Sequence, residues 1–264
     1  MSHIAAALPV HRPLSRLRLF TPAVIGTMVP DFHLLLPDAP DRLQTHSYWP
    51  GLLSFSLPMG LICLALTLLL IKPALLEVVP DGPYVRLQES QRQPAIAGPL
   101  RWLLVIAALL AGAVSHLVWD GFTHESAAGV RMFPVLDSYA PEVNGHSLQL
   151  YRWLQYGSSA GGLLLLLVGI AIWLWHARTS FERPQRTLSA LERGCWLALY
   201  LLLPLLAIGL TFWWVHLSQH AFPALGSKLE LVGVAGMRAS AFTLVAVSLL
   251  VRARVALAGK GRRC

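Results

Sequence analysis

The stretch "LRWLLVIAALLAGAVSHLVWDGFTH", Leu100–His124, decides the kind of fold that this chain can form. Its first part is apolar over enough residues to cross a hydrocarbon layer about 30 Å thick, because a helix rises about 1.5 Å per residue. Its last part places His116, Asp120 and His124 in the same segment. Polar groups at a hydrocarbon layer are expensive to desolvate, so these three residues need a specific purpose.

The composition of the whole chain predicts the same environment. Of the 264 residues, 55% are hydrophobic and only 13% are charged, whereas soluble domains carry roughly 25% charged residues. We therefore expect an all-α, polytopic integral membrane helix bundle that forms a single domain over residues 1–264. Five segments are long enough to span a bilayer: Gly51–Ile71, Leu100–Gly121, Gly157–His176, Gly194–His216 and Leu229–Val251.

The N-terminal region adds a shorter element. "LFTPAVIGTMVPDFHLLL", Leu19–Leu36, is interrupted by two prolines and fits either a short sixth span or a re-entrant hairpin. We divide the chain into an N-terminal helical hairpin (residues 1–49), central spans (50–176) and C-terminal spans (177–264). Two polar stretches, Lys72–Pro99 and Thr123–Tyr156, are expected to be the longest solvated loops.

The distribution of positive charge predicts the orientation of the spans. With six spans, 16 of the 21 Lys and Arg residues lie on one side and 4 on the other, and with five spans the division is 13 to 7. Because cytoplasmic loops carry the excess of Lys and Arg, we expect a multi-pass protein of the inner (plasma) membrane with a cytoplasmic C-terminus. The net charge of +8 is explained by these loops, so we expect membrane lipids as partners and no nucleic-acid binding.

The His116–Asp120–His124 pattern is a candidate metal site. Residues four apart share one face of a helix, and such neighbours can bind one ion. The two histidines are separated by about 12 Å of helical rise, so one ion cannot contact all three side chains. Asp120 could instead bridge two ions about 3.5–4 Å apart, each with its own histidine. The alternative is a hydrogen-bonded cluster that packs helices together.

Three more residues are expected at the same outer end. Asp31 follows an X-Pro break, where helices usually end, and His46 directly precedes a span. His3 joins them if Ile4–Val10 and Pro22–Val29 form a helical hairpin. Carboxylate oxygen and imidazole nitrogen suit Zn²⁺, Mn²⁺ or Fe²⁺.

These motifs resemble those of a known family. "SHLVWDGFTH", "GTMVPDF", "THS" and the early "SH" resemble a bacterial integral-membrane family of unknown function, which is itself similar to membrane-bound proteins described as metal-dependent hydrolases. More distantly, their order resembles the zinc-dependent phospholipase C and P1 nuclease superfamily, in which a cluster of three metal ions hydrolyses phosphoesters. That resemblance places metal ligands at His3, Asp31, His46, His116 and Asp120. The final HxxxE or HxxxD pair of that superfamily is absent, so we expect two ions.

The function implied is a membrane-bound metal-dependent hydrolase with two divalent ions, most simply zinc. Its substrate would be a phosphoester or a lipid-linked compound at the extracytoplasmic face. Asp31 and Asp120 are the candidate catalytic residues, Asp120 as the bridge and Asp31 as a general base if it is not a ligand. The alternative is a non-enzymatic membrane protein, either a metal-handling transporter or an assembly factor.

The charge distribution generates a test of orientation. A cysteine placed at Ser138, within the basic-poor loop 122–156, should react with a membrane-impermeant maleimide in intact cells. Labelling that requires permeabilised membranes would place this loop, and the candidate site with it, on the cytoplasmic side.

Overall fold

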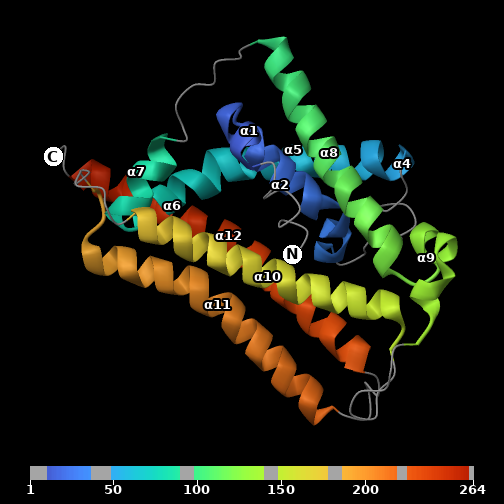
Figure 1. The fold of residues 1–264 in the computed structure, drawn as a ribbon. Helices are drawn as coiled ribbons and strands as arrows, with labels where there is room; N and C mark the ends of the chain where they lie inside the picture. Colours follow the sequence, from blue (N-terminus) through green and yellow to red (C-terminus); the bar gives the residue numbers. More distant parts are fainter. Residues whose placement is uncertain are drawn as a thin grey trace. The chain divides into compact units, whose positions relative to one another are not determined.

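The computed structural model describes residues 11–36, 49–89, 98–139, 148–177, 186–218 and 225–261, and these residues are organised as helices (Figure 1). Within those ranges there is no strand, and one isolated antiparallel bridge joins Tyr139 to Gln149. The expected all-α class is confirmed. In the described residues, five helices are long and apolar enough to cross a membrane: Trp49–Val78, Pro99–Thr123, Leu150–His176, Ala190–Leu217 and Leu231–Gly259.

The chain divides into two compact units, the first of which comprises residues 1–33, 40–64 and 93–176. Its core lies where α2 and α8 run side by side (Figure 1). Its described elements are α1 (His11–Arg16), α2 (Phe20–Met28), the 3-10 helix η2 (Val29–Leu35, as far as His33), α4 (Trp49–Gly51), η3 (Leu52–Ser56), α5 (Leu57–Leu66, as far as Leu64), α8 (Pro99–Thr123), α9 (Ala128–Met132), η5 (Pro134–Asp137) and α10 (Leu150–Ala177).

Two glycines bring the backbones of α2 and α8 into direct contact. A Cβ atom on Gly26 would lie 2.0 Å from the carbonyl oxygen of Leu109, and one on Gly112 would lie 2.2 Å from the carbonyl oxygen of Ala23. Small residues of this kind are what allow membrane helices to approach closely. The side chains around the contact, including Val29 and Leu109, are fully buried. The relative placement of α2 and α8 therefore depends on Gly26 and Gly112.

The first long helix contains two π-helical turns, each just before a proline. The π-helix η3 ends at Ser56, two residues before Pro58, and η4 (Thr67–Ile71) ends two residues before Pro73. Proline lacks the N–H of the i→i−4 bond, and its ring clashes with the carbonyl four residues earlier. The wider i→i−5 bonds, such as Leu57 N–H to Leu52 O, are a known way to accommodate such a disturbance inside a helix.

The second unit comprises residues 34–39, 65–92 and 177–264. Its elements are η4, α6 (Lys72–Val78), α7 (Asp81–Glu89), α11 (Ala190–Leu217) and α12 (Leu225–Gly261), together with the last residues of η2 and α5. The buried core joins α6, α11 and α12, and a hydrogen bond of 2.8 Å links Tyr200 Oη to Ser248 Oγ inside it. Ser189 and Glu192 form a reciprocal capping box at the start of α11, which satisfies donors that a helix N-terminus leaves open.

Most of the apolar side chains on α11 lie on the surface. Leu201, Leu202, Leu205 and Leu206 are each more than half exposed. A continuous apolar surface of this kind is unfavourable in water, where burial gains about 25 cal/mol per Å². The surface fits a multi-pass membrane protein whose lipid-facing side chains are covered by the bilayer.

Two expectations about the elements between the spans need revision. Lys72–Pro99 is not one solvated loop, because Lys72–Val78 continues the first long helix and Asp81–Glu89 forms α7. Lys72 and Pro73 suggest a polar break, yet Ala74 and Val78 beyond them are buried in the core of the second unit. A sixth N-terminal span is not confirmed, since α2 has only nine residues and measures about 14 Å along its axis.

Arg186 stabilises the turn between α6 and α7 through hydrogen bonds. Its guanidinium donates to the carbonyl oxygens of Leu76 and Val79 and to Asp81 Oδ1, and it stacks 3.9 Å from the ring centre of Tyr84. Arg193 donates to the same carboxylate oxygen at 3.0 Å. The two bonds from Arg186 to Leu76 and Val79 satisfy carbonyl oxygens that the C-terminus of α6 leaves open.

The glycine contact predicts an asymmetric result for two Gly→Ala changes. Gly112→Ala should lower the free energy of unfolding by roughly 1–3 kcal/mol, because the new methyl group overlaps backbone atoms that cannot move aside. Gly161→Ala, on α10 with nothing within 4 Å, should instead gain up to about 1 kcal/mol from helix propensity. Unfolding of the purified protein in detergent measures both, and equal effects would contradict the close contact.

The Asp81 cluster predicts a pH-dependent contribution to stability. Burial raises the pKa of the Asp81 carboxyl, but the hydrogen bonds and charges of Arg193 and Arg186 outweigh it and leave the pKa below its ordinary value. The contribution is therefore complete above the unfolded pKa, about 4, and disappears as the pH falls through the lower folded pKa.

Asp81→Asn should accordingly lower stability at neutral pH, by on the order of 1 kcal/mol or less because the carboxylate is partly exposed. The deficit should vanish in acid, when both proteins carry a neutral side chain at this position. Thermal unfolding against pH measures it, with Asp137→Asn as a control at an exposed carboxylate on η5. A deficit that persists unchanged in acid would exclude the ion pairs as its cause.

Candidate metal centre

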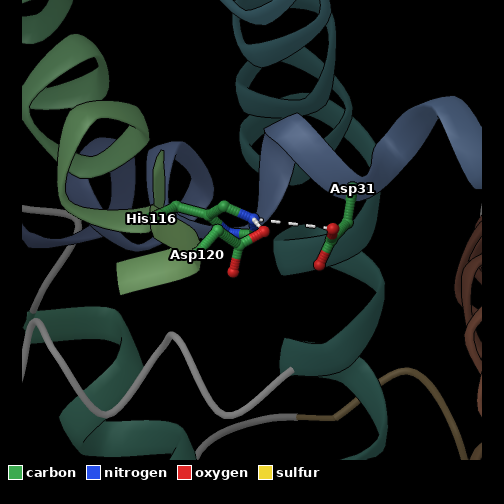
Figure 2. Close-up of side chains that lie close together, drawn as sticks. All are labelled: Asp31, His116 and Asp120. Atoms are coloured by element: carbon green, nitrogen blue, oxygen red, sulfur yellow. Dashed lines mark ion pairs between the residues drawn. The ribbon is translucent and has the colours of Figure 1, made fainter. Parts of the chain in front are cut away.

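The C-terminal part of α8 carries two ionisable side chains that are buried in the first unit, His116 and Asp120. The side chain of His116 is fully buried and that of Asp120 is 8% exposed, although both lie on a helix apolar enough to cross a membrane. α8 ends at Thr123, so the pair lies within two turns of the helix end. The opposing element is η2, which presents Asp31 (Figure 2).

His116 is oriented by the backbone of α2. Its Nδ1 lies 2.8 Å from the carbonyl oxygen of Thr27, a buried contact. The chain tightens into 3-10 geometry directly after α2, where the donor to the Thr27 carbonyl would be the N–H of residue 30. Pro30 has no N–H to donate there, and the imidazole N–H of His116 donates to this carbonyl oxygen. Because the bond requires a proton on Nδ1, it directs Nε2 toward the carboxylates.

Three ligand atoms converge at this point, one from each of three side chains. His116 Nε2 lies 3.5 Å from Asp31 Oδ1 and 3.3 Å from Asp120 Oδ2. The dashed lines in Figure 2 mark these ion pairs. One ligand atom from each residue lies within 4.8 Å of the others. All three are acceptors when the imidazole is neutral, so a proton or a cation is needed to hold them together. Asp31 is the most exposed of the three, at 29%, which leaves one side open.

His124 lies beside this group without belonging to it. Its Nδ1 is 3.6 Å from Asp120 Oδ1 and 3.3 Å from the Asp120 carbonyl oxygen. Its Nε2 lies 3.1 Å from Gln155 Nε2 on α10, which makes the Gln155 amide the donor and leaves the His124 proton on Nδ1. The Asp120 carboxylate is thus flanked by an imidazole at each oxygen, Oδ2 facing His116 and Oδ1 facing His124.

Two further expected ligands, His3 and His46, lie outside the described residues. His216 on α11, whose four-residue spacing from His220 we interpret as interfacial packing, is exposed. Arg238, a cation within the last long helix, donates to the carbonyl oxygens of Leu34 and Leu36 within the second unit.

Sequence reasoning passed over one buried histidine. His33, two residues after Asp31, is 5% exposed, and its Nδ1 lies 2.9 Å from the carbonyl oxygen of Pro30. Its position in the 3-10 turn next to a candidate ligand was the available signal. Ser115 and Thr123, which flank the motif, bond to carbonyl oxygens of their own helix.

The fold and the site together define a helical protein of the membrane-spanning class, with a buried Asp–His–Asp group near the end of its second long helix. The chain belongs to the family described as "Domain of unknown function (DUF4184)", which matches residues 1–255. The family expected from the motifs is thus confirmed as one of unknown function, while its link to metal-dependent hydrolases receives no support. No protein of curated function and no solved structure matches the chain.

Proposed function

We propose that this protein is a membrane-bound metal-dependent hydrolase that binds a divalent cation, most simply zinc, between Asp31, His116 and Asp120. The observation that carries the proposal is the convergence of three ligand atoms from three side chains. Carboxylate oxygen is a hard ligand and imidazole nitrogen is a borderline one. Zinc binds both kinds of ligand.

The two distances from His116 Nε2 are compatible with a bound metal ion, and the ligand atoms of Asp31 and Asp120 lie within 4.8 Å of each other. A tetrahedral ion with bonds of about 2.0–2.1 Å holds its ligand atoms about 3.3–3.4 Å apart. The separations from His116 Nε2 are 3.3 and 3.5 Å, whereas charge-assisted N–H···O bonds are usually about 2.7–2.9 Å. In addition, metal-binding histidines typically donate their second ring N–H to a carbonyl or carboxylate, and His116 donates to Thr27.

A second ion would share the Asp120 carboxylate at Oδ1, on the side of His124. Amide oxygen and nitrogen are assigned from the hydrogen-bond network, so the side chain of Gln155 can also be placed with its oxygen toward His124. His124 would then carry its proton on Nε2, and the Nδ1 lone pair would face Asp120. Asp31, His116 and Asp120 would then hold the first ion, and Asp120 and His124 the second.

The reaction proposed is hydrolysis of a phosphoester, including one in a lipid. The oxygen of water forms a bond to phosphorus, the ester P–O bond breaks, and the alcohol leaves with a proton. A bound divalent ion supplies Lewis acidity and lowers the pKa of water. His116 and Asp120 hold the ligand geometry, and Asp31, the most exposed of the group, is the side chain best placed to accept a proton if it is not a ligand.

The proposed site faces away from the cytoplasm. It lies near the end of α8 that leads into the basic-poor loop, and the Lys and Arg distribution assigns that loop to the outer side. We therefore propose an inner-membrane location with the C-terminus in the cytoplasm.

The short distances from His116 Nε2 to both carboxylates also fit a second candidate without enzymatic activity. A proton on His116 Nε2 would also join the two carboxylates, and the resulting ion-pair cluster would fasten η2 to α8. The site would then be structural, or part of a metal-handling or assembly protein, and the protein would not hydrolyse phosphoesters.

Metal content distinguishes the two candidates. Asp120→Asn preserves the size of the side chain and removes the negative charge of the carboxylate that would contact both ions. We expect it to abolish bound metal and phosphodiester hydrolysis while the protein still inserts, because the apolar length of its helices is unchanged. His216→Ala, at an exposed histidine on another helix, should retain both. Elemental analysis of protein purified without chelators measures the first property.

The outcomes separate the parts of the proposal. Wild-type protein without stoichiometric metal would support the structural candidate. Full metal occupancy without hydrolysis of any phosphoester would preserve the site and remove the reaction.

A further inference from the structure

The connection between α8 and α10 exposes an unusual number of large apolar side chains. In the segment Arg131–Tyr139, every residue except Leu136 is exposed. Met132, Phe133, Val135 and Tyr139 are between 49% and 72% exposed. A loop that faces water usually carries polar side chains at such positions. An exposed apolar cluster marks an interaction surface instead.

This segment is attached to the last turn of α8. A Cβ on Gly129, in α9, would lie 2.7 Å from the carbonyl oxygen of Gly121 and equally close to the ring of Phe122. The rings of Phe122 and Phe133 lie 6.1 Å apart. Phe122 is two residues beyond Asp120, which is about 3 Å along the helix axis. The beginning of the 131–139 segment therefore lies at nearly the same level of α8 as the candidate site.

The exposed surface is continuous with the apolar face of α8. Val114, Val118 and Trp119 are between 38% and 46% exposed, and Val118 and Phe122, four residues apart, share one side of the helix. The face that meets lipid along α8 thus passes onto Phe133 and its neighbours. The segment combines charged Arg131 and Asp137 with apolar and aromatic side chains, a composition typical of segments that lie in a membrane interface.

We propose that the 131–139 segment lies in the lipid head-group layer and sets the depth of the Asp31–His116–Asp120 group at that layer. The substrate part of this inference rests on the proposed hydrolase function. The phosphoester would belong to a lipid head group, because a head group reaches this depth without leaving the bilayer. The occupant of the exposed surface is the lipid monolayer itself.

Spin labels on single cysteines test the depth. In a variant with Cys63, Cys195 and Cys264 replaced by serine, nitroxides are placed at Met132 and Val135, with Glu125 and Leu165 as matched exposed controls in the loop and in the middle of α10. The protein is reconstituted in vesicles of phosphatidylcholine and phosphatidylglycerol. We expect the first two labels to meet oxygen more often than a water-soluble nickel chelate, with a ratio between those of Leu165 and Glu125.

Two results would overturn this placement. Labels at Met132 and Val135 that meet the nickel chelate as often as Glu125 would place the segment in water. Labels that meet neither reagent would show that another part of the chain, or a second copy, covers it. Neither result depends on an ion bound at the candidate site, so loss of the proposed metal site would leave the depth unaffected.

The substrate class has its own measurement. Met132→Ser together with Val135→Ser should reduce hydrolysis of phosphatidylglycerol in vesicles severalfold and leave hydrolysis of soluble bis(4-nitrophenyl) phosphate unchanged. Equal loss on both substrates would refute the lipid head group as substrate. Wild-type protein inactive on both would refute the hydrolase function and, with it, the substrate assignment.

Discussion

The contact between α2 and α8 is the constraint on which the candidate site depends. Gly26 and Gly112 lack the side chains that would separate the two backbones, and at this close approach His116 hydrogen-bonds to the Thr27 carbonyl. The hydrogen bond then fixes the ring so that Nε2 faces Asp31 and Asp120. The two glycines therefore determine both the packing of α2 against α8 and the orientation of the His116 ring.

The long helices were predictable from sequence because their signal is one-dimensional. A bilayer demands about 20 consecutive apolar residues, and hydrophobicity along the chain reports that directly. Lys72–Val78 was missed because Lys72 and Pro73 imitate the end of a span, whereas the π-helical turn before them allows the helix to continue. The burial of Ala74 and Val78 depends on contacts with distant segments, which a local pattern does not record.

The candidate site was likewise predictable only in part. His116 and Asp120 were predictable as a pair from their four-residue spacing, and Asp31 from its place after Pro30. The roles of the Thr27 carbonyl and of Gln155 were not, because a carbonyl has no residue-specific signature and Gln155 lies 31 positions from His124. The small residues at Gly26 and Gly112 were visible in the sequence, but only the fold shows that they meet each other.

The π-helical turns at Leu52–Ser56 and Thr67–Ile71 also bear on how the family can vary in length. Each such turn holds one residue more than an α-helical turn closed by the same number of bonds. Removing one residue there, with the following proline replaced, would restore a regular helix and keep the side chains on either side of it facing as before. The same deletion in α8 would rotate His116 away from Asp120 or Thr27. Single-residue gaps in an alignment of relatives are thus expected inside the first long helix and not inside α8.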